Sequence, residues 1–272
     1  MVVTALEVTG QIAVARAALP GRGTKGIDTM DLFTVIGRGH SGTRAMSHTL
    51  SASGVYMGQP QNGAGDLLPP EDMYEACRVF GRYVSWKGGL EWDFSKVLSM
   101  DPDPAFTRLI ESFLSDVLAS DADKKGWKIP ETTLCWPWIL KTFPEINGIY
   151  WVRNPRDCIL GRHLTDDMAR FGIEGPKSDD EREQRAISWR YQFELVKASP
   201  RPKRWVSLSL EEFVRNQDEV LKKLGELVGL EIARIPVKPE AVGRYKSAEG
   251  VSYYDFLGPA MQELGYEVPA GN

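Results

Sequence analysis

The chain has 272 residues, of which 42% are hydrophobic and 26% are charged, and its formal net charge is -4. This length and composition indicate a globular, soluble protein with one large α/β domain, or at most two small ones. The acidic balance argues against general nucleic-acid binding, which needs a basic face, and no stretch approaches the ~20 apolar residues of a membrane span.

The N-terminal segment 1–31 is predicted to be an extension of uncertain structure. It leans apolar, but it lacks a basic start and contains Glu7, so we do not expect a signal peptide. Met30 directly precedes the first clear strand and could be the true start of the protein. The segment could equally be an oligomer arm or an added strand, and a homo-oligomer is among the states that the sequence allows.

A strand, a glycine-rich loop and a helix follow one another near the N-terminus. The strand is predicted from the apolar, β-branched run 32–36, the loop is the segment 37–44 with the sequence GRGHSGTR, and the helix covers 43–53. Glycines let the backbone approach an anion closely, and the N-terminus of a helix adds partial positive charge. This stretch therefore predicts a site for a phosphate-like group.

The loop matches only half of the nucleotide-binding pattern G-x-x-x-x-G-K-[ST]. Gly37 and Gly42 have the right spacing, but Thr43 replaces the lysine and Arg44 replaces the hydroxyl that holds magnesium. A phosphoryl-transfer enzyme normally needs both of the missing groups. We therefore expect a loop that holds a phosphate-like or sulfuryl group without that magnesium arrangement.

The remaining elements alternate between helices and strands. Helices are predicted at 71–83, 105–119, 133–142, 156–170, 179–198, 220–228 and 256–264, and strands at 127–129, 146–152 and 205–208; the segment 84–96 is expected to be irregular. This order predicts a three-layer α/β/α fold with a central parallel sheet, like that of P-loop NTPases, over residues 32–272. Ligands of such sheets bind beyond the carboxyl ends of the strands.

A second basic motif directly follows the strand at 146–152. Its sequence is Arg153-Asn154-Pro155-Arg156-Asp157. An arginine at the carboxyl end of a strand in the same sheet can reach the ligand of the glycine loop with two parallel hydrogen bonds.

The ordered set of motifs resembles the sulfotransferases that use PAPS (3′-phosphoadenosine 5′-phosphosulfate), in particular bacterial members. GRGHSGTR resembles their 5′-phosphosulfate loop, and RNPRD resembles their 3′-phosphate motif. WKIP at 127–130, the segment 206–230, VGRYK at 242–246 and ELGY at 263–266 are also similar to family segments. The resemblance covers about residues 32–266.

The resemblance implies an enzyme that moves the sulfuryl group of PAPS to a hydroxyl or amine of a small-molecule or glycan acceptor, by in-line displacement and without a metal. The residues implied in binding the donor are Arg38, Gly39, His40, Ser41, Gly42, Thr43, Arg44, Arg153, Gly161, Arg244 and Lys246. The alternatives are a non-catalytic nucleotide-binding or scaffold protein of the same fold and, with less support, a P-loop kinase.

Three positions depart from the family pattern. His40 stands where the family usually has a lysine that steadies the bridging oxygen as the sulfate leaves, and a protonated histidine could take that role. Gly161 stands where a serine donates to the 3′-phosphate, so that Arg162 or the late basic loop has to compensate. Ala45 stands where many members have the aromatic residue that stacks on adenine.

A general base must take the proton of the acceptor as it attacks sulfur. Asp66 is the first choice, because glycan-directed members of the family carry a carboxylate in this region, and His163 and Glu131 are the reserves. Lys128 is expected to contact the sulfuryl group or to orient the acceptor, and His48 to be structural.

The tryptophans divide into two groups. Trp86 and Trp92 lie in the segment 84–96 and are candidates for stacking on a sugar or an aromatic acceptor. The others considered lie within predicted elements and are expected in the core: Trp136, Trp138, Trp151, Trp189 and Trp205. The three cysteines, Cys77, Cys135 and Cys158, are scattered and odd in number, so we expect free thiols and a cytoplasmic protein.

Overall fold

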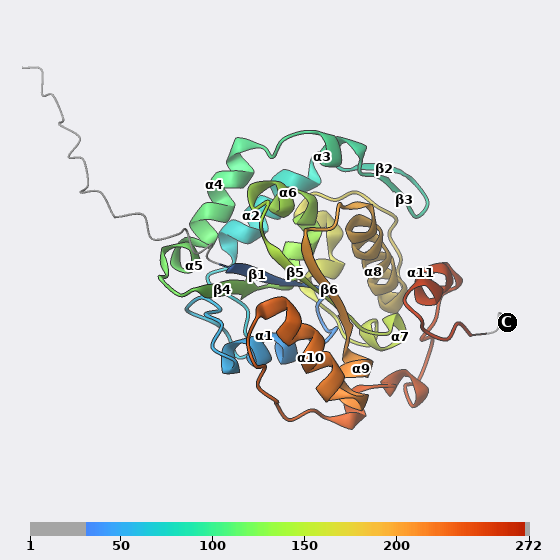
Figure 1. Cartoon of the computed structure of the whole chain (residues 1–272). Coiled ribbons are helices and arrows are strands. Elements are labelled where there is room, and N and C mark those ends of the chain that lie inside the picture. The colour runs from blue at the N-terminus through green and yellow to red at the C-terminus, as the bar shows by residue number, and fades with distance from the viewer. Residues whose placement is uncertain (1–30, 270–272) are drawn as a thin grey trace, which may run out of the picture.

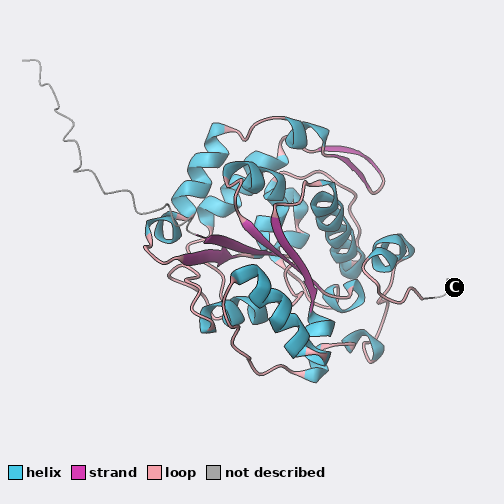
Figure 2. Ribbon diagram, in the orientation of Figure 1, coloured by secondary structure: helices cyan, strands magenta, loops and turns pink. Residues whose placement is uncertain are grey.

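Four parallel strands form the central sheet of the computed structural model, which describes residues 31–269. The spatial order is β4 (Lys124–Lys128), β1 (Asp31–Ile36), β5 (Asn147–Val152) and β6 (Arg204–Ser209), and every neighbouring pair is parallel (Figures 1 and 2). The predicted α/β class is confirmed. The expected N-terminal extension, apart from Asp31, lies outside the described residues.

Helices cover both faces of the sheet because alternate side chains of each strand point to opposite faces. Phe33 and Val35 of β1 pack toward α1 (Thr43–Ala52), α9 (Leu210–Arg215) and α10 (Gln217–Val228). Ile36 belongs to the core on the other face, which α2 (Glu71–Gly81), α4 (Pro104–Phe113), α6 (Trp136–Thr142) and α8 (Glu181–Ala198) cover (Figure 1). The result is the predicted α/β/α layering.

The remaining elements are short. The helices are α3 (Ser95–Ser99), α5 (Ser115–Ala119), α7 (Pro155–Cys158) and α11 (Gly258–Glu263), and the two-stranded antiparallel hairpin consists of β2 (Ser85–Gly88) and β3 (Glu91–Asp93). The 3-10 turns are η1 (Pro130–Cys135), η2 (Leu164–Asp166), η3 (Met168–Phe171), η4 (Pro239–Ala241), η5 (Arg244–Lys246) and η6 (Asp255–Leu257). None of the described helices is long and apolar enough to cross a membrane.

The helix predicted over 156–170 is wrong. The chain forms only α7 there, and then η2 and η3. The side chain of His163 accepts a hydrogen bond from the backbone N–H of Thr165, and Asp167 similarly accepts from Arg170, so each residue caps a new turn. Side chains that bond to the nearby backbone in this way favour turns over a continuous helix.

Three other predictions also need correction. The segment 84–96 is not irregular, because it contains the β2–β3 hairpin and the start of α3. The helix predicted over 105–119 breaks at Leu114 into α4 and α5, and the one predicted over 133–142 begins as the 3-10 turn η1. Pro137 lies in the first turn of α6, where a missing N–H costs no hydrogen bond.

Close contact between β4 and β1 requires a glycine at position 126. A Cβ atom added to Gly126 would lie 2.2 Å from the backbone oxygen of Phe33, its partner across the ladder. We predict that Gly126→Ala lowers the free energy of unfolding by about 1–3 kcal/mol, because the strands must move apart. Urea unfolding measures this change. Gly63→Ala is the matched control, since no atom lies within 4 Å of its added Cβ, and equal losses in the two variants would contradict the account.

Candidate active site

The glycine loop connects the carboxyl end of β1 to α1 and lies against β5. A Cβ atom on Gly37 would lie 2.2 Å from the backbone oxygen of Trp151, so no larger residue fits there. The N–H of Gly37 donates to the hydroxyl of Thr133 at 2.9 Å, and the indole N–H of Trp151 donates to the backbone oxygen of Ser41 at 2.9 Å. These contacts fix the loop at the edge of the sheet where β1 and β5 end.

The N-terminus of α1 offers free donors to an anion. The residue before the helix is Gly42, with φ 90°, and it has no side chain to cap the first turn. The backbone amides of Thr43 and Arg44 donate to no described residue. Arg44 is exposed and lies close enough to Lys128 to lower the pKa of that amine. Free amides, a helix terminus and an arginine together fit a phosphate or sulfuryl group.

Arg38 joins the glycine loop to the segment after β5. Its side chain is 2% exposed, and its guanidinium forms an ion pair with Asp166 at 2.7 Å. The same group donates to the backbone oxygens of Gly39 at 2.9 Å, Cys158 at 2.8 Å and Gly161 at 3.2 Å. An arginine has five N–H donors, and all five are used here. The geometry gives Arg38 a supporting role within the protein, which differs from the cofactor contact predicted for it.

Arg153 lies beside this loop at the carboxyl end of β5. It donates to the backbone oxygen of His40 at 2.8 Å and to that of Ala241, and its ion pair with Asp157 measures 3.4 Å. The Nε atom of Arg153 is buried and has no hydrogen-bond partner. The same is true of the hydroxyl oxygen of Ser41. Two unpartnered polar groups between the two basic motifs fit an anionic ligand there.

Asp157 holds the late basic loop against the RNPRD motif. Its two carboxylate oxygens accept hydrogen bonds from the backbone N–H groups of Gly243 at 2.8 Å and Tyr245 at 2.9 Å. Arg156 lies 4.0 Å above the ring centre of Tyr245, a cation–π contact. Arg244 and Lys246 are thereby held beside the motif, exposed, and they form no ion pair with a described residue.

His40 and Gly161, two positions that depart from the family pattern, lie against each other. A Cβ atom on Gly161 would lie 2.9 Å from Nδ1 of His40, so a side chain there would press against the imidazole. His40 has φ 62°, in the left-handed region. Loss of hydration, Arg38 and Arg153 lower the pKa of His40. This direction favours a neutral imidazole, whereas the lysine-like role considered for His40 requires a protonated one.

His163 lies on the other side of His40, with 5.9 Å between the ring centres. Its Nδ1 accepts a hydrogen bond from the backbone N–H of Thr165 at 3.2 Å, and the backbone N–H of His163 donates to the Asp166 carboxylate at 2.7 Å. Burial, and then the charge of Arg38, lower the pKa of His163 to about 3. An imidazole with so low a pKa is a weak base at neutral pH.

Besides the glycine loop and the RNPRD motif, the site contains Lys128 and the carboxylates of Asp66 and Glu131. Lys128 lies at the end of β4, forms an ion pair with Asp66, and donates to the backbone oxygen of Ala64 at 2.7 Å. Burial lowers the pKa of Lys128, and Asp66 opposes that shift. Glu131 follows in η1 and is 2% exposed. Burial raises the pKa of Glu131 to about 7, and the negative charge of Asp66 contributes to this increase.

The structure brings the predicted catalytic residues into one electrostatic group. Asp66 and Lys128 both influence the pKa of His163, as does His40, and Asp66 and Lys128 also influence that of Glu131. Sequence reasoning missed Thr133 and Asp166, whose partners lie 96 and 128 residues away along the chain. No local pattern marks such long-range partners.

The expected division of the tryptophans holds only in part. Trp136, Trp138 and Trp151 are fully buried and Trp189 nearly so, as predicted for core residues. Trp92 has a structural contact, because its indole N–H donates to the backbone oxygen of Glu174 at 2.8 Å. Within residues 31–269, no group of three or more His, Cys, Asp or Glu side chains is arranged to hold a metal ion.

The fold is an α/β sandwich with a parallel sheet, and the glycine loop and the RNPRD motif lie at the carboxyl edge of that sheet, where such folds bind their ligands. The sequence model of the family described as "Sulfotransferase family" matches residues 33–234. Because this match covers more than half of the chain, the protein belongs to the sulfotransferase family. The comparison with curated proteins found no match.

The solved structures similar to this chain include the following three. The sulfotransferase domain from the Synechococcus PCC 7002 olefin synthase has a TM-score of 0.55 and 13% identity, over 91% of this chain and 99% of that one, and it supports the fold. The sulfotransferase domain from the curacin biosynthetic pathway has a TM-score of 0.44 and 16% identity, over 82% and 79%. A sulfotransferase from Alicyclobacillus acidocaldarius has a TM-score of 0.44 and 15% identity, over 87% and 96%.

The Arg38–Asp166 pair generates a stability prediction. We expect Asp166→Asn to lower the free energy of unfolding by about 3–5 kcal/mol, because it leaves a buried guanidinium without its counter-charge. Chemical unfolding at neutral pH measures the loss. The control is Asp218→Asn, which breaks an exposed ion pair with Arg234 and should cost less than about 1 kcal/mol. Similar losses in the two variants would show that the buried pair does not stabilise the loop.

Proposed function

We propose that the protein transfers the sulfuryl group of PAPS to a hydroxyl or amine of an acceptor. The observation that carries this proposal is the placement of two anion-binding motifs at one edge of the sheet. β1 and β5 are neighbours in parallel register, so the glycine loop and Arg153 follow strands that end side by side. A donor with phosphate groups at both its 5′ and 3′ positions would bridge such motifs.

The donor-binding roles follow from the contacts of each residue. The free amides of Thr43 and Arg44, the Ser41 hydroxyl and the Arg44 guanidinium would hold the 5′-phosphosulfate. Arg153, with its unpartnered Nε, and the exposed Arg244 and Lys246 would hold the 3′-phosphate.

Several of the residues predicted to bind the donor also shape the loop. Gly39 has the ring of His163 directly against it, since an added Cβ would lie 2.0 Å from that ring. Gly42 starts α1 without a side-chain cap, and Gly161 leaves room for His40. Arg38 fixes the distance between the two motifs through Asp166.

The transfer step is an in-line displacement at sulfur. The acceptor oxygen or nitrogen forms a bond to sulfur while the bond from sulfur to the bridging oxygen of the 5′-phosphate breaks. The products are adenosine 3′,5′-bisphosphate and a sulfate ester from a hydroxyl or a sulfamate from an amine, and the acceptor proton goes to a base on the enzyme. Lys128 and Arg44 supply positive charge beside the transferred group, and a neutral His40 donates a hydrogen bond to the bridging oxygen.

Glu131 is the best-suited general base in this group. A base acts most effectively when its pKa lies near the working pH, and burial raises that of Glu131 to about 7. Its carboxylate accepts no hydrogen bond from another described residue, whereas Asp66 is bound to Lys128. We therefore assign proton removal to Glu131 and the orientation of Lys128 to Asp66, the base first expected from the sequence.

The described cysteines are free thiols, and the Sγ atoms of Cys77 and Cys135 lie 3.9 Å apart without a bond. Free thiols suit a reducing compartment, and we place the reaction in the cytoplasm.

The donor site is tested by isothermal titration with adenosine 3′,5′-bisphosphate. We expect Arg153→Ala to weaken binding about 10–100-fold, because a charge-assisted hydrogen bond contributes about 1.5–3 kcal/mol. Arg201→Ala is the matched control, since Arg201 is exposed and pairs with no described residue, and it should bind like the wild type. Equal affinity in the two variants, with both proteins folded by circular dichroism, would contradict the role of Arg153.

The base is tested by the pH dependence of bisphosphate release from PAPS, with water as the acceptor. Below pH 7 the Glu131 carboxyl is protonated, so kcat/KM should fall about tenfold per pH unit. We expect the Glu131→Gln variant to have a much lower kcat/KM, and the remaining activity to show no fall below pH 7. A variant that keeps the wild-type profile would exclude Glu131 as the base.

Glu131→Gln should also change how the stability of the folded protein depends on pH. A carboxyl group whose pKa rises from 4.5 to about 7 on folding stabilises the protein below pH 4.5, and this contribution is lost as the pH rises through 7. Glu131→Gln should therefore stabilise the protein at pH 8 by up to about 3 kcal/mol and leave it unchanged at pH 4. Thermal unfolding at the two pH values measures the difference, and equal shifts at both would contradict the raised pKa.

A further inference from the structure

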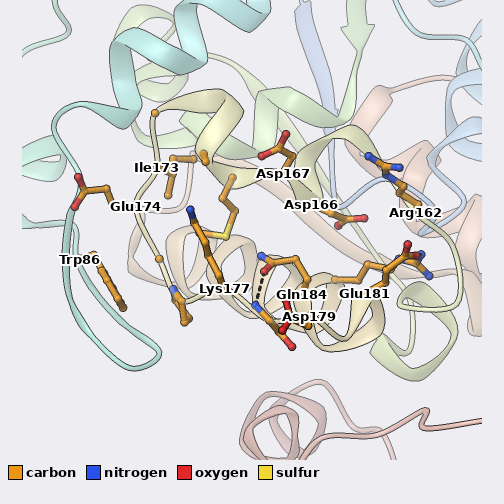
Figure 3. A pocket seen from close by; sticks show the side chains of 17 residues that line it. Trp86, Arg162, Asp166, Asp167, Ile173, Glu174, Lys177, Asp179, Glu181 and Gln184 are labelled. Carbon is orange, nitrogen blue, oxygen red and sulfur yellow. Dashed lines mark hydrogen bonds and ion pairs between the residues drawn. The ribbon is translucent and has the colours of Figure 1, made fainter.

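A cavity lies between the β2–β3 hairpin and the segment that runs from η2 into α8. Its volume is about 900 Å³, and Figure 3 shows the side chains that line it. This volume lies within the range of small-molecule sites, roughly 300–1,000 Å³. None of the roles assigned above uses it.

The cavity adjoins the donor loop. Asp166 lines the cavity and forms the buried ion pair with Arg38 of the glycine loop. Arg162 also lines it, and the preceding residue, Gly161, lies against His40. The cavity is therefore adjacent to the donor loop, because Asp166 and Arg162 contact both.

Trp86 presents an aromatic surface to the cavity. It is 39% exposed, and its indole N–H donates to the backbone oxygen of Gly89 within the hairpin. Its ladder partner Trp92 binds the backbone oxygen of Glu174, at the rim of the cavity. Trp92 thus fastens the hairpin to the backbone of Glu174, while Trp86 lines the cavity (Figure 3).

The charges in the cavity are mixed. Two of its carboxylates are neutralised, since Asp166 pairs with Arg38 and Glu181 pairs with Arg185. The remaining charged side chains that line it are Asp167, Glu174, Asp179, Arg162 and Lys177. These carboxylates accept hydrogen bonds and outnumber the two cations, so the lining suits hydroxyl and ammonium groups and opposes a polyanion.

We propose that this cavity binds the sulfuryl acceptor, and that the acceptor is a sugar that is uncharged or carries amines. The proposal rests on the sulfotransferase function proposed above. A sugar ring presents an apolar face to the indole of Trp86, while its hydroxyl or ammonium groups donate to Asp167, Glu174 and Asp179. The acceptor end that carries the reacting group lies toward Arg162 and His40.

The test is direct binding of oligosaccharide probes to the full chain saturated with adenosine 3′,5′-bisphosphate, measured by calorimetry and saturation-transfer NMR. The probes are N,N′,N″-triacetylchitotriose, its amine-bearing counterpart chitotriose, a heparosan hexasaccharide as the polyanion, and 4-nitrophenol as an aromatic acceptor. We expect both chitotrioses to bind at least about tenfold more tightly than the polyanion and the phenol. Tighter binding of the polyanion or the phenol, or no binding of either chitotriose, would overturn the proposal.

Variants of the cavity locate the site. Trp86→Ala should weaken chitotriose binding about tenfold, and Trp86→Phe, which keeps a ring face, should retain most of it. Asp179→Asn should weaken the amine-bearing probe more than the acetylated one. Leu118→Ala, another exposed apolar side chain that does not line the cavity, is the control. Chitotriose affinity that Trp86→Ala leaves unchanged would place the acceptor elsewhere.

Failure of the acceptor proposal is distinguishable from failure of the proposed function. Trp86→Ala should leave bisphosphate affinity within about twofold of the wild type, because the donor motifs do not include the hairpin. Bisphosphate binding with no Trp86-dependent sugar binding overturns only the acceptor proposal. Trp86-dependent sugar binding without any bisphosphate binding supports the cavity as a sugar site and overturns the sulfotransferase function.

Discussion

The arrangement of the site depends on one buried cation, the guanidinium of Arg38. An unpaired charge in this position would be strongly destabilising, and the chain avoids that cost by filling all five donors with Asp166 and three backbone oxygens. These partners come from the glycine loop itself and from the segment that follows β5. The two motifs proposed to hold the two ends of the donor are therefore fixed relative to each other before any ligand binds. Such preorganisation reduces the cost of ordering the site on binding.

His40 and Gly161 illustrate how one departure from the family pattern accommodates another. The imidazole lies where a side chain at position 161 would need space, so a glycine at 161 permits a histidine at 40. Burial and the nearby arginines lower the pKa of this histidine, and Arg44 and Lys128 are the cations proposed to lie beside the transferred group. Asp166 of the buried pair also lines the cavity proposed for the acceptor.

Most of the fold was predictable because strongly periodic or β-branched segments mark their own structure. The strands at β1 and β5 and the helices α1, α2 and α8 follow from such patterns. The helix predicted after Arg153 failed because His163 and Asp167 cap separate turns. The hairpin at Trp86 was missed because its two strands have only 4 and 3 residues, too few to show a clear alternation. In the site, the loop and RNPRD are local motifs that sequence reveals. The roles of Thr133, Asp166 and Glu131 depend on burial and on partners distant in sequence, which no local pattern encodes.

The central claim is that the two motifs form one site for a nucleotide with separate 5′ and 3′ phosphate groups. It is tested most directly by comparing the affinities of the wild-type protein for adenosine 3′,5′-bisphosphate, adenosine 5′-monophosphate and ATP with magnesium. The account predicts that the bisphosphate binds at least about tenfold more tightly than the monophosphate, because only the bisphosphate reaches Arg153, and more tightly than ATP with magnesium. Equal affinity for the bisphosphate and the monophosphate, or a preference for ATP with magnesium, would contradict it.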